Sequence, residues 1–351
     1  MVLRKLALAS LAGASSATVL FSADCAGAGT GTGECIYSMD VDALNVKANL
    51  TAELAYASSG KISALEVDVP HSKIYWTDRT NEVLMGATLG ADFADAMVLA
   101  SGMGEPHDVS ARLSTGAVYF ADKVKGTVEF SADYGATHQT FASDLEEPVG
   151  VEVDDDNARL YVGDYKAGAI WAYDLDKPGF RVPFQANCTQ PRSILLNDGY
   201  VYWIEVGGSD PDSVAAGAVY RQPAGQFGGA KTLFASGFVD PDALAVIEDT
   251  LLITDESSGF ITHAAFDADG VVYAADYQLV KAAAPRAIAS FTSVDVDASG
   301  AWAQLAAVAA GASAASLPVG GLLAVLAVGL LAAKAASKKQ AAYEPVADAE
   351  V

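Results

Sequence analysis

Short runs in which apolar and polar residues alternate fill the middle of this 351-residue chain, and each run ends at a turn. One stretch near the centre shows the pattern well: VGVEVD (149–154), RLYVGD (159–164), AIWAYDLD (169–176) and FRVPFQA (180–186). Alternation with a period of two, bounded by turn residues such as DDDN, predicts β-strands. Because this region contains no convincing 3.6-residue period, it is predicted to be all-β.

The strand pattern repeats with a period of about forty residues. An acidic residue closes one apolar strand in each copy, first in KIYWTD (73–78), and the copies are 44, 42, 41 and 50 residues apart. These strand-end acids are Asp78, Asp122, Asp164, Glu205 and Asp255. A proline precedes each later unit, at Pro106, Pro148, Pro191 and Pro241. Four strands in about forty residues are the signature of a β-propeller blade.

The ends of the repeat region predict one more blade, closed by both ends of the chain. SVDVDASGAWAQ (293–304) resembles the first two strands of a unit, while CIYSMDVDA (35–43) and ANLTAELAY (48–56) resemble a third and a fourth. Closure of this kind removes exposed sheet edges. The prediction is a six-bladed propeller over 35–304. One alternative stays open, since 266–277 reads as either an inner or an outer strand pair, which would change the blade count.

The first 34 residues have the composition of a leader. Residues 1–23 combine Arg4 and Lys5 with an apolar run, which is typical of a secretory signal peptide. Small residues offer two cleavage points, after Ser15-Ser-Ala17 or after Ala26-Gly-Ala28. Residues 24–34 are predicted to be a flexible, Gly-rich leader segment.

The C-terminal part predicts a membrane anchor. An Ala/Ser-rich stalk (305–316) precedes 17 uncharged residues (317–333), and three lysines follow this stretch. A stretch of this length predicts a transmembrane helix with a cytoplasmic tail (334–351), and the alternative is a buried core helix. In the tail, Tyr343 and Val346 match a tyrosine-based sorting signal. The predicted location is therefore a single-pass plasma-membrane or endomembrane protein with its N-terminal part outside or lumenal.

The charge excludes one class of partner. The net charge is −23, and no Lys/Arg surplus is clustered along the chain. Binding of nucleic acid requires such a surplus, so no nucleic-acid partner is predicted. The acidic balance by itself indicates a soluble, self-repelling surface.

The three cysteines and two glycosylation motifs fit a secretory route. Cys35 pairs with Cys188 if cleavage follows Ala28, whereas an earlier cut makes Cys25–Cys35 the local option. Asn49 and Asn187 begin N-x-Thr acceptor motifs. No CxxC or other metal-ligand spacing occurs.

The repeats resemble a known family. IYWTD, with LEVD before it and VLMGATL after it, is similar to the YWTD repeat of low-density-lipoprotein-receptor-type six-bladed propellers. VYFAD, LYVGD and LLITD are looser copies that are also similar to NHL repeats. The resemblance implies that the strand-end acids, with Tyr75 and Trp76, are structural, and that members bind protein ligands. The cysteine-rich modules that usually accompany such propellers do not occur here.

The segments that lead into each blade are the candidate ligand-binding site, because they differ between blades and propeller ligands meet loops at one end of the channel. The candidate residues are Glu105, His107, Asp108, Glu147, Arg192, Asp240 and Asp242. Oxygen-rich side chains of this kind suit a hard cation, so Ca²⁺ is the one candidate cofactor. Ordinary polar loop residues are the alternative explanation.

The predicted function is that of a receptor-like or adhesion protein whose propeller recognises a protein, glycan or cation. The alternative is a membrane-tethered, metal-dependent lactonase or esterase of the gluconolactonase type, with Glu105 or Glu147 and Asp240 as metal ligands. No GxSxG, HExxH or P-loop motif supports an enzyme, and no catalytic residue is assigned. A third possibility is a structural coat glycoprotein without a dedicated ligand.

Overall fold

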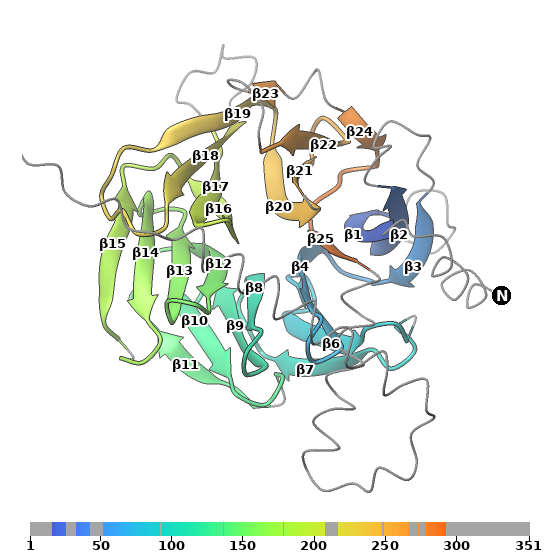
Figure 1. Cartoon of the computed structure of the whole chain (residues 1–351). Coiled ribbons are helices and arrows are strands. Elements are labelled where there is room, and N and C mark those ends of the chain that lie inside the picture. The colour runs from blue at the N-terminus through green and yellow to red at the C-terminus, as the bar shows by residue number, and fades with distance from the viewer. Residues whose placement is uncertain are drawn as a thin grey trace, which may run out of the picture. The chain divides into compact units, whose positions relative to one another are not determined.

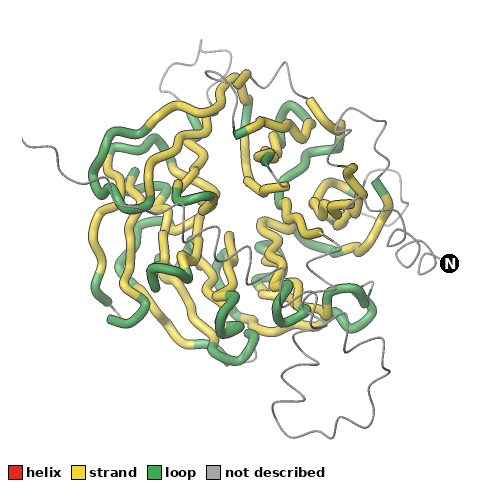
Figure 2. Tube along the Cα trace, in the orientation of Figure 1, coloured by secondary structure: helices red, strands yellow, loops and turns green. Residues whose placement is uncertain are grey.

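The described chain is built from six small antiparallel sheets arranged around a central axis (Figures 1 and 2). The computed structural model describes residues 16–25, 33–42, 52–91, 93–135, 137–177, 179–207, 217–247, 249–266, 272–273 and 278–292. Among these residues every regular element is a strand. The all-β, six-bladed propeller predicted from the repeat period is confirmed.

Five blades follow one another along the chain, and each begins at its innermost strand. Blade one contains β4 (Ile62–Asp68), β5 (Lys73–Asp78), β6 (Val83–Thr88) and β7 (Met97–Ser101). Blade two contains β8 (Pro106–Arg112), β9 (Ala117–Asp122), β10 (Thr127–Ser131) and β11 (Gln139–Ala142). Blade three contains β12 (Pro148–Asp154), β13 (Arg159–Asp164), β14 (Ala169–Asp174) and β15 (Arg181–Ala186).

Blades four and five keep the same order. Blade four contains β16 (Pro191–Asn197), β17 (Tyr200–Glu205), β18 (Gly217–Pro223) and β19 (Thr232–Phe238). Blade five contains β20 (Pro241–Ile247), β21 (Thr250–Asp255), β22 (Phe260–Ala265) and β24 (Gln278–Lys281). The short strand β23 (Val272–Tyr273) runs parallel to β19 as a fifth strand. The described strand of the segment 266–277, which the sequence left open, therefore lies at the outer edge of blade four and not in an inner strand pair.

Each marker proline is the first residue of an inner strand. Pro106 is paired with Asp122, and Pro148 with Asp164, so proline and strand-end acid face each other across the first two strands. The inner strand is the edge of its sheet, where a residue without an N–H is tolerated. The proline and the acid thus mark the same end of every blade in which both occur.

The sixth blade is built from both ends of the described chain, as predicted. Its third and fourth strands overlap the predicted segments 35–43 and 48–56, whereas its first and second strands differ from the prediction. Its order is β25 (Ile288–Thr292), β1 (Ser16–Asp24), β2 (Glu34–Asp42) and β3 (Glu53–Ala57). The innermost strand is 288–292, while most of the predicted 293–304 lies outside the described residues. The second strand is β1, which lies in the segment predicted as signal peptide. The propeller therefore starts by Ser16, not at Cys35, and the Gly-rich 24–34 is a connection between two strands.

The hydrophobic core lies between neighbouring sheets. Leu20 and Ile36 of blade six pack with Ile62, Ile74 and Trp76 of blade one in one such layer. The other interfaces have equivalent apolar clusters. Because each sheet is covered on both faces, its strands are apolar on both sides, as the burial of Ile74 to Asp78 shows.

The predicted stalk, the transmembrane helix at 317–333 and the tail with Tyr343 and Val346 lie outside the described residues. Within the described residues, no helix is long and apolar enough to span a bilayer.

Candidate functional site

The strand-end acids are buried and hold backbone groups. Asp122 accepts hydrogen bonds from the backbone N–H groups of Gly104 and Glu105, at 2.8 and 3.1 Å, and of Lys125, at 3.1 Å. Asp164 binds Glu146, Glu147 and Ala167 in the same way. Asp255 repeats the pattern with Val239, Asp240 and Ser258. These carboxylates fasten the segment entering a blade to the second strand of that blade.

The other two strand-end acids use different donors. Asp78 accepts from Ser58 Oγ at 2.6 Å and from the backbone N–H of Asn81 at 3.0 Å. Glu205 accepts from Thr189 N and Trp203 Nε1 and pairs with Lys231 at 2.5 Å. Tyr75 and Trp76 are 1% and 0% exposed. The whole set therefore has the geometry of structural residues.

The entry segments and the turns after the strand-end acids meet at one end of the ring, which we call the mouth face. The backbone N–H of Lys123, directly after Asp122, donates to the carbonyl of Glu105, directly before Pro106. The same bond joins Tyr165 to Glu147 and Glu256 to Asp240. The opposite end, the far face, carries the turns that follow the inner and third strands.

Arg192 forms the most compact group on the mouth face. Its Nη1 lies 2.9 Å from Asp240 Oδ1 and 3.3 Å from Asp242 Oδ1, and its guanidinium lies 5.8 Å from the Tyr165 ring centre. Burial acts to lower the pKa of Arg192, but the two carboxylates outweigh it and raise the pKa. The structure therefore brings three of the seven predicted residues into one ion-paired cluster.

Glu105 and Glu147 meet around a lysine. Lys123 Nζ lies 3.8 Å from a Glu105 oxygen and 3.9 Å from a Glu147 oxygen. The three side chains are 27–32% exposed, so water screens this bridge and it contributes little to stability. The Lys123 ammonium and the Glu105 and Glu147 carboxylates therefore remain accessible to a ligand.

His107 lies where these charges converge. Burial lowers its pKa to about 3, helped by the positive charges of Arg79, Arg192 and Lys123. The imidazole is therefore neutral at pH 7, between three cations that come from three different blades.

Arg79 is a mouth-face residue that sequence reasoning missed. It follows Asp78 directly and is half-buried. Its charge acts on His107 of blade two and Asp242 of blade five, yet its guanidinium makes no ion pair or hydrogen bond within the described residues. The available signal was variation: the residue after the strand-end acid is Arg79, Lys123, Tyr165, Val206 or Glu256.

A cavity of about 230 Å³ lies below the mouth and is lined by the inner strands of all six blades. His107, Asp108 and Asp242 face it, together with Glu66 and Glu152. Burial raises the pKa of Asp108 to about 7 and that of Glu152 to about 8. It also raises the pKa of Glu66 well above its ordinary value, assisted by the charge of Glu152.

The cavity carboxyls bind the backbone of the next blade. Glu66 accepts from Ala111 N, Asp108 from Val151 N, and Glu152 from Leu196 N, at 2.9–3.0 Å. Inner strands expose unpaired N–H groups along the channel, and these bonds satisfy them. Within the described residues, no group of three or more His, Cys, Asp or Glu side chains is placed to hold a metal ion. The arrangement thus fits inter-blade fastening.

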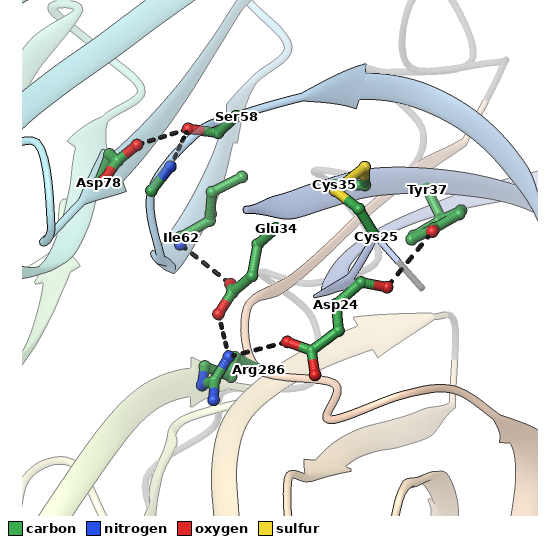
Figure 3. Close-up of a disulfide and its surroundings, with 10 residues drawn as sticks. Asp24, Cys25, Glu34, Cys35, Tyr37, Ser58, Ile62, Asp78 and Arg286 are labelled. Carbon is green, nitrogen blue, oxygen red and sulfur yellow. Dashed lines mark hydrogen bonds and ion pairs between the residues drawn. A yellow bond between two sulfur atoms is a disulfide. The ribbon is translucent and has the colours of Figure 1, made fainter. Parts of the chain in front are cut away.

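A buried arginine joins blade six to its neighbours (Figure 3). Arg286 is 4% exposed and pairs with Glu34 of β2. It also pairs with Glu256, which lies in the turn after β21 of blade five. Glu34 also accepts from Ile62 N of blade one at 3.0 Å. Burial raises the pKa of Glu34 to about 7, although Arg286 opposes the rise. Three blades therefore meet at one ion-paired cluster.

The three cysteines and one of the two glycosylation motifs lie within the described residues. Cys25 and Cys35 form a disulfide across the β1–β2 connection, while Cys188 is free and buried (Figure 3). Burial raises the pKa of Cys188 to about 12, which keeps it a thiol. Asn187 is exposed, and Asn49 lies outside the described residues.

Comparisons with known proteins identify the fold of the chain. No family model matches the chain, and no curated protein matches its sequence. Among solved structures, a chain of the crystal structure of a nidogen/laminin complex matches with a TM-score of 0.62 and 14% identity. The match covers 78% of this chain and 98% of that one. The chain is a six-bladed β-propeller, and the resemblance to YWTD-type propellers is confirmed at the level of the fold.

Proposed function

We propose that this protein is a membrane-anchored, receptor-like or adhesion propeller that binds a protein ligand on its mouth face. The fold is consistent with a binding role, because the matching chain comes from a structure titled as a complex of two proteins. The mouth face adds the stronger support. Its positive and negative side chains are only partly neutralised by one another, so they remain available to complement the charges of a protein ligand.

The observation that carries the proposal is the unpartnered guanidinium of Arg79. The chain has a net charge of −23, so carboxylates outnumber cations, and several half-buried cations, among them Arg112, Lys123 and Lys231, pair with one. Arg192 does so with Asp240 and Asp242, whereas Arg79 does not within the described residues. A protein ligand that places an acidic side chain there would form a charge-assisted hydrogen bond shielded from water. Lys123, Glu105 and Glu147 would add a mixed-charge rim that sets orientation.

The way in which the described chain ends is compatible with an anchor. β25 starts at the mouth face and ends at Thr292 on the far face, where Thr292 pairs with Ala17. The last described residue therefore lies on the face opposite the proposed ligand site. The exposed Asn187 suits the glycosylation expected of an extracellular or lumenal domain.

A matched pair of variants tests the mouth face. The full-length chain carrying Arg79→Ala and Lys123→Ala is compared with one carrying Arg112→Ala and Lys177→Ala, which makes the same charge change on the far face. Arg112 and Lys177 pair with Asp155 and Asp174 there. Both variants and the wild type are displayed on cells, and surface proteins cross-linked to them are quantified by mass spectrometry.

We expect at least one surface protein to be recovered with the wild type and the far-face variant, and to fall at least tenfold with the mouth-face variant. Equal recovery with both variants would refute the proposed face. No protein enriched over an unrelated membrane propeller would favour the structural coat alternative. The lactonase alternative requires a bound metal ion. Within the described residues, no three His, Cys, Asp or Glu side chains are placed to hold one, so neither a lactonase nor a Ca²⁺ site is proposed.

The tail adds a separate proposal. Tyr343 and Val346 have the spacing of a tyrosine-based sorting signal, and we propose that they direct internalisation of the anchored propeller. Tyr343→Ala should at least double the surface half-life in an antibody-uptake assay. An unchanged half-life would rule this out.

A further inference from the structure

The strand β1 constrains where the leader is removed. The sequence offers two cleavage points, after Ala17 and after Ala28. The first falls after the second residue of β1 (Ser16–Asp24), and the second falls beyond its end. Loss of a leader that ended at Ala28, or at Ala23, would remove most or all of this strand. The two cleavage points therefore produce very different mature proteins.

β1 is an interior strand of blade six. It is paired with β2 from Ser16–Asp42 to Asp24–Glu34, and with β25 from Ala17–Thr292 to Phe21–Ile288. β25 and β2 are joined only through it. Without β1, the inner strand β25 would lose its sheet, and the ring would open at the channel.

The side chains of β1 are buried on both faces. Val19 and Phe21 are 0% and 2% exposed and pack against blade five, while Leu20 packs against blade one. Ser22 Oγ donates to Ile62 O at 3.2 Å and accepts from Ala287 N at 3.1 Å, so it joins blade one to the segment entering β25. If β1 were removed with the leader, the mature protein would lose all of these contacts.

The disulfide gives an independent constraint. Cys25 follows β1 directly and is bonded to Cys35 at the start of β2. Cleavage after Ala28 would remove Cys25 and leave Cys35 without its partner. Cleavage after Ala17 keeps both cysteines and retains Thr18–Asp24, including the bond from Thr18 Oγ1 to Asp40 Oδ1 at 3.0 Å.

We propose that the leader is cleaved between Ala17 and Thr18, so that Thr18 is the N-terminus of the mature propeller. This inference rests on the secretory route included in the proposed function. Ala17 and Ser15 supply the small residues that such a cut requires, and the cut leaves every buried side chain of β1 in place.

The test maps the N-terminus of the full-length chain made in a secretory-competent eukaryotic cell. The protein is isolated from the cell surface, its amines are labelled before digestion, and the N-terminal peptide is identified by mass spectrometry. We expect a peptide that begins at Thr18 and contains Cys25 linked to Cys35. A start at Asp24 or beyond would overturn the proposed cut while leaving the secretory route intact. A chain that starts at Met1 or Val2 and never reaches the surface would contradict the secretory route itself.

Thiol counting provides a second readout that does not depend on finding that peptide. The unreduced, denatured mature protein should react with one equivalent of a maleimide, at Cys188. In the Cys25→Ser variant, the count should rise to two. A cut after Ala28 predicts instead that Cys35 and Cys188 are both free or paired with each other, giving two or zero in the wild type and no change in the variant.

Discussion

Blade three and blade six contain the same four-stranded sheet but are held together differently. In blade three, four strands follow one another within Pro148–Ala186, and Asp164 fastens the entry segment through three backbone bonds. In blade six, the strands come from both ends of the chain. Its sequence equivalent of Asp164 is Asp24, at the end of VLFSAD, whose side chain is 55% exposed. A disulfide and the buried pair of Glu34 with Arg286 occur there instead.

The difference shows what continuity of the chain contributes. A blade made from one segment needs only a carboxylate to fix its entry, because the neighbouring strands are already close in sequence. A blade made from distant segments must also overcome the entropy of bringing them together. Stronger local interactions at the closing blade offset that cost, and they include a cross-link and a multivalent arginine.

The largest expected effect comes from Arg286→Ala. The substitution leaves Glu34, which is 2% exposed, without its cation, and breaking a buried ion pair in this way costs about 3–5 kcal/mol. Denaturant unfolding of the propeller measures the loss. Arg112→Ala, which breaks the part-exposed pair with Asp155, is the control and should cost at most about 1 kcal/mol. Equal losses would show that Arg286 has no special role in closure.

A smaller loss of stability is expected from substitution of Asp164, and a still smaller one from substitution of Asp24. Asp164→Ala leaves three backbone N–H groups without an acceptor, so it should cost about 2–4 kcal/mol. Asp24→Ala removes a half-exposed side chain and should cost less than about 1 kcal/mol. The midpoints of thermal unfolding compare the two. If Asp24→Ala proved as damaging as Asp164→Ala, blade six would be fastened like the others.

The carboxyl groups that line the cavity make the stability of the propeller dependent on pH, and they do so in blade three but not in blade six. Glu152 of blade three has its pKa raised to about 8, so the folded state binds its proton more tightly than the unfolded state. Its contribution is therefore fully present below about pH 4.5 and is lost as the pH rises through about 8. Glu152→Gln should unfold like the wild type at pH 5 and be about 1–2 kcal/mol more stable at pH 9. The estimate is reduced because the group faces the channel.

The control for this titration is in blade six, whose inner strand contributes no carboxyl to the cavity lining. Glu53→Gln removes the carboxylate of an exposed residue of β3 outside the cavity and serves as the matched Glu→Gln control. Parallel curves for wild type and Glu152→Gln from pH 5 to pH 9 would show that Glu152 titrates normally.

The smallest effect is a gain. Four residues after the strand-end acid, blades one, two, three and five have a residue with positive φ, which is glycine at Gly126, Gly168 and Gly259 but Glu82 in blade one, with φ of 57°. A non-glycine residue is strained in this conformation. Glu82→Gly should therefore stabilise the protein by about 0.5–1 kcal/mol in denaturant unfolding. Gly168→Ala should do the opposite, because the added Cβ would lie 2.7 Å from the Cys188 carbonyl oxygen. A stabilising Gly168→Ala would show that this turn has no such constraint.

Blades one to five could be predicted from the sequence because they share residues that recur at a regular spacing. The acid recurs at the end of the second strand in all five blades, and the proline recurs at the start of the first strand in blades two to five. Blade three was placed to within two residues at each strand end. The third and fourth strands of blade six were predicted as well, but its second strand was missed because VLFSAD is as apolar as a leader, and composition alone does not distinguish a buried strand from a signal sequence.

The candidate site was predictable in part for the same reason. Arg192, Asp240 and Asp242 stood out because the entry segments differ between blades, and the structure brings them together. Arg79 was missed because it follows a repeated structural acid directly. Its exposure, and its lack of a partner within the described residues, depend on side chains from other blades, which the order of residues does not reveal.

The central claim is that β1 and β25 pair to close the ring, because an open ring would have neither a channel nor a mouth face. Hydrogen–deuterium exchange of the mature protein tests it directly. The account predicts that amides of Val19–Ala23, in the strand paired on both sides, exchange as slowly as those of Leu160–Gly163 in blade three. Exchange of these amides within seconds, with blade three still protected, would contradict closure by both ends of the chain.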